Sequence, residues 1–566
     1  MGEKVQVKQI NYTGGIFLGL QKGKNYSFLE TGRPVAEGMN GAVTSPHYLA
    51  TQTGKRILDQ GGHAVEAAIA VNAVLCVVIP HMAGLGGDLF ALIWDQDEKE
   101  VKSMHGSGKS GSYVNREAYK QKELREIPER GPLAANTIPG TVDAWWELHQ
   151  QYGRLKWEVL FEDAVHYAES GFPITDKVSN FIQEKAELLS DHATTKQVFF
   201  KNDRPILAGE LLVQPDLAWS FNQIAQSGRD AFYNGEITDK IIASMEKHGG
   251  LLVKEDFKEH SLEWERPLST SYRGYEIYQV KPNTQGIAVL MMLNMLEKND
   301  MTSIQDGTPE YYHLLAETAK LKFRFRDKWV TDLETIDLPY DELLSKSFSS
   351  EVYDHFSWDD VYREEELEEL PEVDDGRDTA YLSVVDKEGN SISLIQSIFH
   401  EFGSGFMPEG CGFFLQNRGS HFSLDENHPN TLEPNKRTFH TIIPGMALKD
   451  GKPFMLFGAM GGEGQPQTQC AMLTKVIDFG YNMQQAIEAP RWLYGRTWGE
   501  DSSTLKLEGR VPDEIINDLR RRGHTVEIVE DYSQTMGHAQ GIIIDHERGV
   551  YSAGADPRGD GIALCW

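Results

Sequence analysis

Cysteine is scarce in this chain: the 566 residues include four, Cys76, Cys411, Cys470 and Cys565. None forms a CxxC pair or lies at a spacing from histidine that is typical of zinc sites. We therefore expect scattered free thiols. The sequence also contains no HExxH motif, EF-hand loop or paired-histidine site, so it implies no metal ion, and it implies no organic cofactor.

Long hydrophobic runs are also absent. No stretch approaches the roughly 20 apolar residues that a membrane helix needs. The most apolar stretch, residues 67–80, is interrupted by Asn72 and predicts a buried helix. The first 20 residues lack the basic segment and apolar core of a secretion signal. We therefore expect no membrane partner and a cytoplasmic location.

Positive charge is in the minority, with 55 lysines and arginines against 85 aspartates and glutamates and a net charge of −30. Such an excess of negative charge argues against nucleic acid as a partner. Hydrophobic residues at 40% and charged residues at 25% are ordinary for a soluble globular protein. The length allows two domains or one large α/β body.

The N-terminal part of the sequence predicts an irregular lead-in over residues 1–40, followed by helices. Ser45 and Pro46 suit the N-cap and first position of a helix that ends at Gly61-Gly62. A second helix is expected over about residues 64–78, ended by Pro80. Further segments follow in order: a strand over 89–94, a mostly helical middle over 160–343, and within it a strand over 272–280.

The dipeptide Asp378-Thr379 separates two unlike segments. Residues 359–378 form an acidic linker, and residues 379–399 follow at once with a strand-turn-strand pattern. Such a junction suits a chain that cuts itself there, because a new N-terminal threonine carries a hydroxyl nucleophile and, in its α-amine, a general base. An unperturbed α-amine titrates near pH 8, close to the value useful at neutral pH. The alternative is an ordinary linker followed by a hairpin.

The hairpin after Thr379 has apolar residues on both faces, so we expect helices to cover both sides of its first strand. Glu388-Gly389 suits the turn, with the glycine at positive φ. Pairing of Lys387 with Asn390 places Ser397 within one residue of Thr379. A second hydroxyl is thus expected beside the nucleophile.

A glycine-rich segment, GAMGGEG at residues 458–464, follows an apolar strand over 453–457. It matches neither GxGxxG nor a loop ending in GK[ST], which argues against nucleotide binding. The backbone amides of Gly461 and Gly462 are suited to hold an oxyanion. A plain structural turn is the alternative, and GLGGD at residues 84–88 favours structural packing.

In combination these features resemble the γ-glutamyltransferase family of N-terminal-nucleophile hydrolases. The resemblance covers nearly the whole chain, in family order: residues 41–90, 136–146, 282–286, 378–393, 434–437, 458–464, 489–491 and 556–561. It implies an α/β fold, the αββα sandwich of two stacked antiparallel sheets flanked by helices. It also implies autocleavage between Asp378 and Thr379. The large subunit, residues 1–378, would hold the lead-in, the N-terminal half of the sandwich, the helical middle and the linker; the small subunit would be residues 379–566.

The resemblance also implies roles for individual residues. Thr379 is similar to the family's nucleophile, and Ser397 to the hydroxyl that assists it. Gly461 and Gly462 are similar to the residues whose amides form the oxyanion hole. Each of these roles agrees with what the residues themselves suggest.

The substrate-binding positions depart from the family pattern. His105 stands where the family has a carboxylate-binding arginine, and Arg418 where it has a glutamine. Phe399 and His421 replace an asparagine and an aspartate that hold the α-amino group, and His440-Thr441 replaces a serine pair. These changes are similar to the cephalosporin (glutaryl) acylase-like branch, whose acyl group carries a carboxylate but no α-amine.

We therefore expect an autoprocessed threonine amidohydrolase that cleaves or transfers a γ-glutamyl or glutaryl-type acyl group. Arg418 is expected to bind a distal carboxylate, with the replaced positions lining the pocket. Two alternatives remain: a glutaryl or cephalosporin acylase-like amidase with little γ-glutamyl activity, and an unprocessed, non-catalytic binding protein. The expected partners are a small amide substrate, the chain's own two subunits and a second copy in a homo-oligomer.

Overall fold

The computed structural model describes residues 31–362, 378–495 and 502–566. Most of the predicted lead-in and most of the predicted acidic linker lie outside these residues. Inside the lead-in, β1 (Ala36–Gly38) pairs with a strand near the C-terminus, so the expectation of irregular structure up to residue 40 is wrong there.

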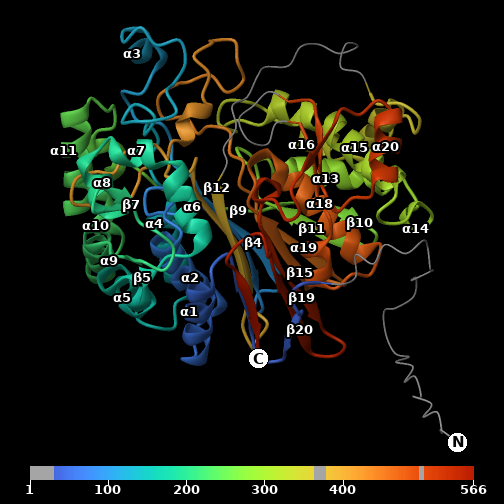
Figure 1. The fold of residues 1–566 in the computed structure, drawn as a ribbon, viewed down its shortest axis with the longest axis horizontal. Helices are drawn as coiled ribbons and strands as arrows, with labels where there is room; N and C mark the ends of the chain where they lie inside the picture. The colour runs from blue at the N-terminus through green and yellow to red at the C-terminus, as the bar shows by residue number, and fades with distance from the viewer. Residues whose placement is uncertain (1–30, 363–377, 496–501) are drawn as a thin grey trace, which may run out of the picture.

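Two antiparallel sheets of seven strands form the centre of the molecule (Figure 1). The first runs in the order β1, β20 (Val550–Ala555), β19 (Ala539–Asp545), β15 (Lys452–Ala459), β14 (Gly445–Lys449), β11 (Tyr275–Gln279) and β10 (Leu268–Tyr272). The second runs β21 (Ile562–Cys565), β2 (Ala42–Ser45), β12 (Asp378–Val385), β13 (Ser391–Phe399), β3 (Asp88–Asp95), β4 (Glu100–Gly106) and β9 (Glu263–Glu265). Both sheets combine strands from before and after residue 378.

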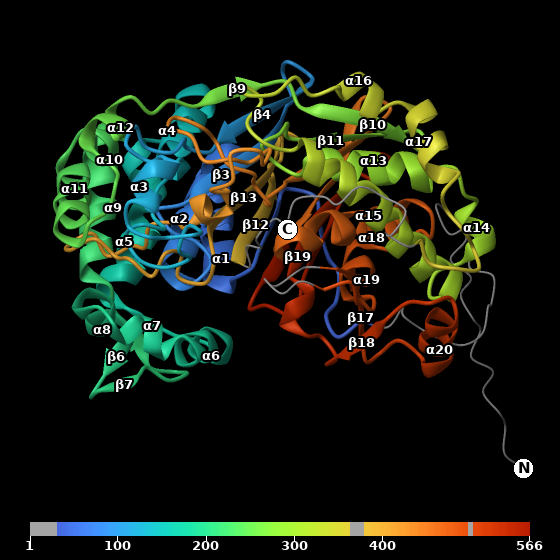
Figure 2. The ribbon, with the colours of Figure 1, turned by 90° about the horizontal axis from the view of Figure 1, so that it is seen from above.

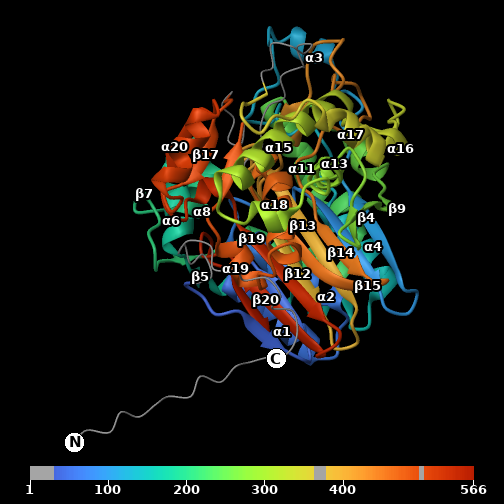
Figure 3. The same cartoon turned by 90° about the vertical axis from the view of Figure 1, so that its right-hand side faces the viewer.

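Helices cover the outer face of each sheet, to the left and right of the strands in Figure 1, and Figure 3 looks onto the helices over the first sheet. Over the second sheet lie α1 (Tyr48–Asp59), α2 (Ala64–Val78), α4 (Thr141–Tyr152), α5 (Glu162–Ser170) and α9 (Pro215–Ser227). Over the first lie α13 (Gly286–Leu296), α15 (Pro309–Trp329), α18 (Gln465–Ile477), α19 (Met483–Glu488) and α20 (Asp513–Arg521). The expected four-layer αββα sandwich is confirmed.

The remaining described helices and strands lie outside these four layers. The helices are α3 (Arg116–Lys120), α6 (Asp176–Glu184), α7 (Ala186–Ser190), α8 (Ala193–Phe199), α10 (Arg229–Tyr233), α11 (Glu236–His248), α12 (Lys254–Lys258), α14 (Met301–Ile304), α16 (Tyr340–Leu343) and α17 (Lys346–Tyr353). Small sheets pair β5 (Phe172–Pro173) with β8 (Leu211–Leu212), β6 (Phe200–Lys201) with β7 (Arg204–Pro205), and β17 (Leu505–Glu508) with β16 (Trp492–Tyr494) and β18 (Val526–Val529). Helices α6 to α8 lie on the α1 side of the molecule (Figure 2). The mostly helical middle is confirmed.

Alternate residues of β12 pack in two different environments. Ala380, Leu382 and Val384 belong to the core beneath the α1 and α2 helices. Tyr381 and Val385 face the other way and pack between the two sheets. The expected alternation is therefore confirmed, but the expectation of helices on both sides of this strand is wrong, since a second sheet covers its inner face.

The start of the first helix differs from the prediction. The N-cap is His47, whose side chain accepts a hydrogen bond from Leu49 N, and α1 begins at Tyr48. Ser45 is instead the last residue of β2, paired with Ile562. The strand pairing of Ser45 therefore overrides the preference of serine for a helix N-cap. The second helix is confirmed at Ala64–Val78 and begins with a capping box between His63 and Glu66.

The strand predicted over residues 272–280 is two strands. A turn at Arg273-Gly274, with both residues at positive φ, separates β10 from β11. The other local predictions agree better: β3 and β15 contain the strands expected at 89–94 and 453–457, and the four cysteines are free thiols. Within the described ranges, no helix is long and apolar enough to span a membrane.

Candidate active site

A β-bulge lies at the start of β12. Asp378 pairs with Phe399 and Ala380 with Gln396, so Thr379 lies opposite two residues, Ser397 and Ile398. The predicted hairpin pairing of Lys387 with Asn390 is wrong by one residue, since Val385 pairs with Ser391 and Asp386 N donates to the Asn390 carbonyl, which makes the turn one residue longer. The consequence drawn from that pairing nevertheless holds, because Ser397 lies beside Thr379. Bulges often occur next to active sites, where they redirect a side chain.

The Ser397 hydroxyl holds this bulge in place. Its Oγ accepts a hydrogen bond from the Phe399 amide at 2.9 Å. Phe399 has φ of +81°, an uncommon conformation for a bulky residue, and such strain persists where the surroundings impose it. Ser397 thus has a structural role in shaping the strand end, and its hydroxyl lies next to the predicted nucleophile.

Thr379 belongs to the inner face of its sheet. It shares that face with Tyr381, and its side chain is 2% exposed. Across the gap, the Tyr381 ring packs closely on Gly458 of β15, where an added Cβ would lie 2.3 Å from the ring. The double-glycine turn follows directly after β15. Thr379 at the start of β12 and the double-glycine turn after β15 therefore lie at the same end of the gap between the sheets.

The double-glycine turn has a backbone that favours glycine. Gly461 has φ of +132° and Gly462 φ of +52°, where most other residues are strained. The side chain of Gln285 donates to the Gly462 carbonyl at 3.0 Å. Arg326 in turn donates to Gln285 at 3.0 Å and forms a buried ion pair with Glu463. This network fixes the turn, and no pattern in the sequence points to the part taken by Arg326.

Arg418 lies in the short helix Arg418–His421 and is 1% exposed. Its Nη2 donates to Ser397 Oγ at 3.2 Å and its Nη1 to Thr441 Oγ1 at 3.0 Å. The guanidinium stacks over the Phe399 ring at 4.1 Å. Its Nε is buried and has no hydrogen-bond partner among the described residues. The predicted carboxylate-binding residue therefore lies beside Ser397, with one donor available.

The carboxylate of Asp88, the last residue of the GLGGD segment, belongs to the same cluster. Asp88 pairs with Ser397 across β3 and β13, and its Oδ2 lies 3.1 Å from His440 Nε2. Burial raises the pKa of Asp88 to about 7, although the positive charge of Arg418 opposes this. Burial likewise lowers the pKa of Arg418 to about 9, against the effect of Asp88. Asp88 could have been found from the sequence only by treating GLGGD as more than a turn.

The predicted histidines are buried and uncharged at neutral pH. His105 and His440 each contact the Phe90 ring edge-on, and His105 Nε2 lies 2.8 Å from Asn283 Oδ1. His421 contacts the Phe399 ring edge-on. Burial lowers the pKa of all three, that of His105 to about 3. None of them supplies the negative charge that an ammonium group needs.

Elsewhere in the described part of the chain, His313, Glu317 and His524 bring three donor atoms within 4.8 Å of one another. Their own contacts already satisfy them. His313 Nδ1 lies 2.8 Å from His524 Nε2, and His313 Nε2 contacts the Ser357 carbonyl. Lys320 donates to Glu317 at 2.8 Å. With an ammonium already bound to its carboxylate, this cluster suits a structural contact between α15 and the α20 region better than a cation site.

Comparisons with known proteins agree with this geometry. The family model described as Gamma-glutamyltranspeptidase matches residues 50–566. The chain is 47% identical to a glutathione hydrolase-like YwrD proenzyme of Bacillus subtilis, over 93% of this chain and 98% of that protein. It is 37% identical to an oxamate amidohydrolase proenzyme of Klebsiella pneumoniae, with the same coverage. A crystal structure of cephalosporin acylase from Bacillus halodurans superposes with a TM-score of 0.87 at 34% identity, covering 96% of this chain and 99% of that one.

Proposed function

We propose a cleavage site and a substrate class for this chain, which belongs to the gamma-glutamyltranspeptidase family and is an autoprocessed amidohydrolase. The chain cuts itself between Asp378 and Thr379. It then hydrolyses amides of small dicarboxylic acids. Residues 1–378 and 379–566 would be its two subunits. The alternative of a non-catalytic binding protein has no support from relatives that are named as hydrolase proenzymes.

The proposed reaction starts at the N-terminal threonine. The α-amine of Thr379 takes the hydroxyl proton as Oγ1 bonds to the amide carbon, and the amides of Gly461 and Gly462 stabilise the oxyanion. The C–N bond then breaks, the protonated α-amine returns its proton to the leaving nitrogen, and an ester to Thr379 remains. Attack by water, or by an acceptor amine, releases the acyl group. Ser397, which holds the bulge, positions the strand end.

Arg418 carries the proposal on substrate class. Its charge lies on the inner face, next to Ser397, and its free Nε edge can receive a carboxylate in a charge-assisted pair. An α-ammonium would find no free anion here, because the positive charge of Arg418 already acts on Asp88 and Glu463 is paired with Arg326. An unpaired buried charge costs several kcal/mol. An acyl group with a carboxylate and no amine therefore suits the site best.

A second candidate is γ-glutamyl transfer or hydrolysis on glutathione-like substrates, which the glutathione hydrolase relatives favour. The buried histidines His105, His421 and His440 would then rebuild the lost contacts to the α-amino group. The proposed localisation is the cytoplasm, and the oligomeric state is expected to be homo-oligomeric.

A substrate panel separates these candidates. We expect glutaryl amides to be hydrolysed at least as well as the matching γ-glutamyl amides, a pair that differs in the α-amine alone. Oxamate, a much shorter carboxylate-bearing amide, tests how far Arg418 lies from the reacting carbonyl. A strong preference for the γ-glutamyl compound, lost when His421 is changed, would overturn the assignment of Arg418.

A further inference from the structure

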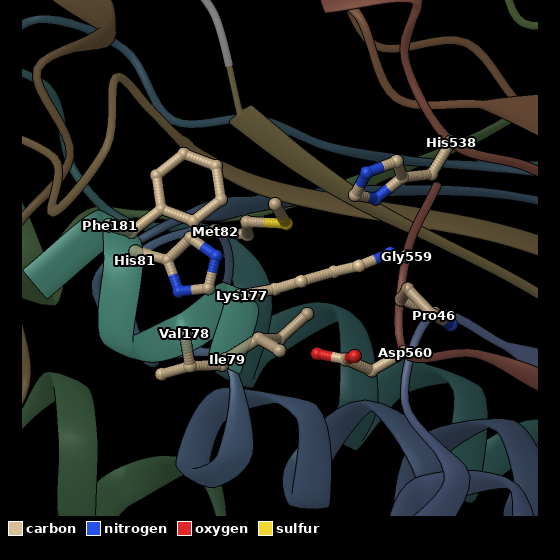
Figure 4. A pocket seen from close by; sticks show the side chains of 10 residues that line it. All are labelled: Pro46, Ile79, His81, Met82, Lys177, Val178, Phe181, His538, Gly559 and Asp560. Carbon is tan, nitrogen blue, oxygen red and sulfur yellow. The ribbon is translucent and has the colours of Figure 1, made fainter. Parts of the chain in front are cut away.

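We propose that a pocket beside the start of β12 binds the carboxylate of the leaving amine, so that the preferred amides are those of α-amino acids. The pocket is lined by Ile79, His81, Met82, Lys177 and Phe181 from before residue 378 and by His538 and Asp560 from after it (Figure 4). This inference rests on the proposed function, since it names the second half of the substrate.

The pocket borders the catalytic segments through backbone contacts. Met82 O accepts from Ile398 N at 3.4 Å, and Ile398 is one of the two residues opposite Thr379. On the other wall, His538 O accepts from Met460 N at 2.9 Å, directly before the double-glycine turn. The pocket is thus bounded by the chain segments that flank the nucleophile on one side and the oxyanion turn on the other.

Its position also matches the side from which the amine departs. The protonated α-amine of Thr379 must reach the leaving nitrogen, and that amine lies where β12 begins. Strand β2 pairs with β12 and leads directly into Pro46, another lining residue. Arg418 instead approaches from the inner face, through the Ser397 side chain. Acyl group and leaving group therefore have separate binding regions.

Two buried imidazoles in the pocket lack hydrogen-bond partners. His81 Nδ1 and His538 Nε2 are both buried and unpartnered among the described residues, and the side chains are 2% and 4% exposed. Figure 4 shows both rings turned toward the pocket. An unsatisfied buried nitrogen costs about 1–3 kcal/mol, so these two nitrogens favour a polar ligand between them.

Lys177 is the cation that a carboxylate would meet in the pocket, whose other charged lining residue is Asp560. Lys177 points across the pocket and donates to the Pro557 carbonyl at 2.9 Å and to that of Arg558, with burial lowering its pKa. The Asp560 carboxylate at the rim already accepts from Thr175 at 2.6 Å. One ammonium and two neutral imidazoles suit a carboxylate, while Ile79, Val178 and Phe181 suit a small apolar side chain attached to it.

The test compares two amides that differ in one group. With the acyl group that the enzyme cleaves best, N-acyl-alanine is expected to exceed N-acyl-alaninamide in kcat/KM by about tenfold or more, as for a hydrogen bond to a charged group. Lys177→Met should reduce this ratio to about 1 and leave hydrolysis of the acyl anilide within about threefold. His81→Phe keeps the stacking on Phe181 without a ring nitrogen, and should reduce the ratio as well.

Lys185→Met is the matched control, because it removes the same charge at the end of α6 from a lysine that faces Glu401. The ratio should stay as in the wild type. A wild-type ratio near 1, or a full ratio in Lys177→Met, would overturn the proposal. If the cleaved protein hydrolyses no acyl amide, the proposed function fails by itself. Binding of alanine against alaninamide, measured by NMR on wild type and Lys177→Met, then decides on the pocket: a carboxylate preference lost in the variant supports it, and equal binding overturns it.

Discussion

Replacing Lys322 by methionine is expected to stabilise the protein below pH 7 and to do so less as the pH rises. Lys322 lies on α15 and is fully buried, and its Nζ has no hydrogen-bond partner within the described part of the chain. The nearest rings are those of Phe348 at 4.9 Å and Phe325 at 6.0 Å. Burial lowers the pKa of Lys322 from 10.5 to about 7, because the charged form loses its hydration.

The size of this shift fixes the expected magnitude. A change from 10.5 to about 7 corresponds to about 5 kcal/mol of destabilisation of the charged form. Between these pH values the unfolded chain holds a proton on Lys322 that the folded chain has lost. The free energy of unfolding therefore rises with pH across this window, and the full cost applies below about pH 7, where both states are protonated.

Thermal unfolding at pH 6 and pH 10 measures the effect, in an uncleaved Thr379→Ala background so that the two subunits cannot separate. At about 2.1 cal/mol/K per residue, the 566 residues give an unfolding entropy of about 1.2 kcal/mol/K, so about 5 kcal/mol raises Tm by about 4 °C. Lys328→Met, an exposed position on the same helix, is the control and should change little. An equal gain at both pH values, or a loss at pH 6, would refute the argument from a buried charge.

Three predictions concern catalysis. Thr379→Ala should remain one chain and be inactive, whereas the wild type should give two chains, the smaller beginning Thr-Ala-Tyr; an active variant or another N-terminus would exclude this nucleophile. Gly462→Val should cut turnover by about 10²-fold or more, while Gly451→Val, at φ of +71° in an open turn, should not; unchanged turnover would leave the glycines a structural role. Arg418→Ala should weaken binding of glutaryl and γ-glutamyl amides alike, and Arg418→Gln should not restore it fully; full restoration would mean that the guanidinium charge is dispensable.

The parts of the fold that the sequence predicted are those that depend on local pattern. Alternating apolar residues identified both faces of β12, and the run at residues 64–78 identified α2, because a buried helix or strand imposes its period on the residues. The errors lie where tertiary pairing overrides local preference. Ser45 is a good N-cap by type but is used in the pairing of β2, and Arg273-Gly274 lies at a turn within a segment of strand-forming residues.

The candidate site shows the same limit. Thr379, Ser397 and the double glycine could be predicted, since a chain junction, a hairpin and a glycine-rich turn are each visible in the sequence. Asp88 and Arg326 could not, because their parts depend on which buried partners surround them. Asp88 lies 330 positions before Arg418 in the chain; the strand pairing of β3 with β13 brings Asp88 to Ser397, and Arg418 reaches the same residue by a side-chain hydrogen bond.

The neighbouring charges of Asp88 and Arg418 predict how substrate binding depends on pH. Burial raises the pKa of Asp88 to about 7, so above this pH its carboxylate is ionised and competes with the substrate's carboxylate for the Arg418 guanidinium. We expect KM for a glutaryl amide to rise as the pH increases through 7, while KM for an uncharged acyl amide stays constant. Asp88→Asn keeps an oxygen for the Gly140 amide, which donates to Asp88 at 3.1 Å, and should remove the pH dependence. A rise in KM that persists in Asp88→Asn would assign the titration to another group and separate Asp88 from carboxylate binding.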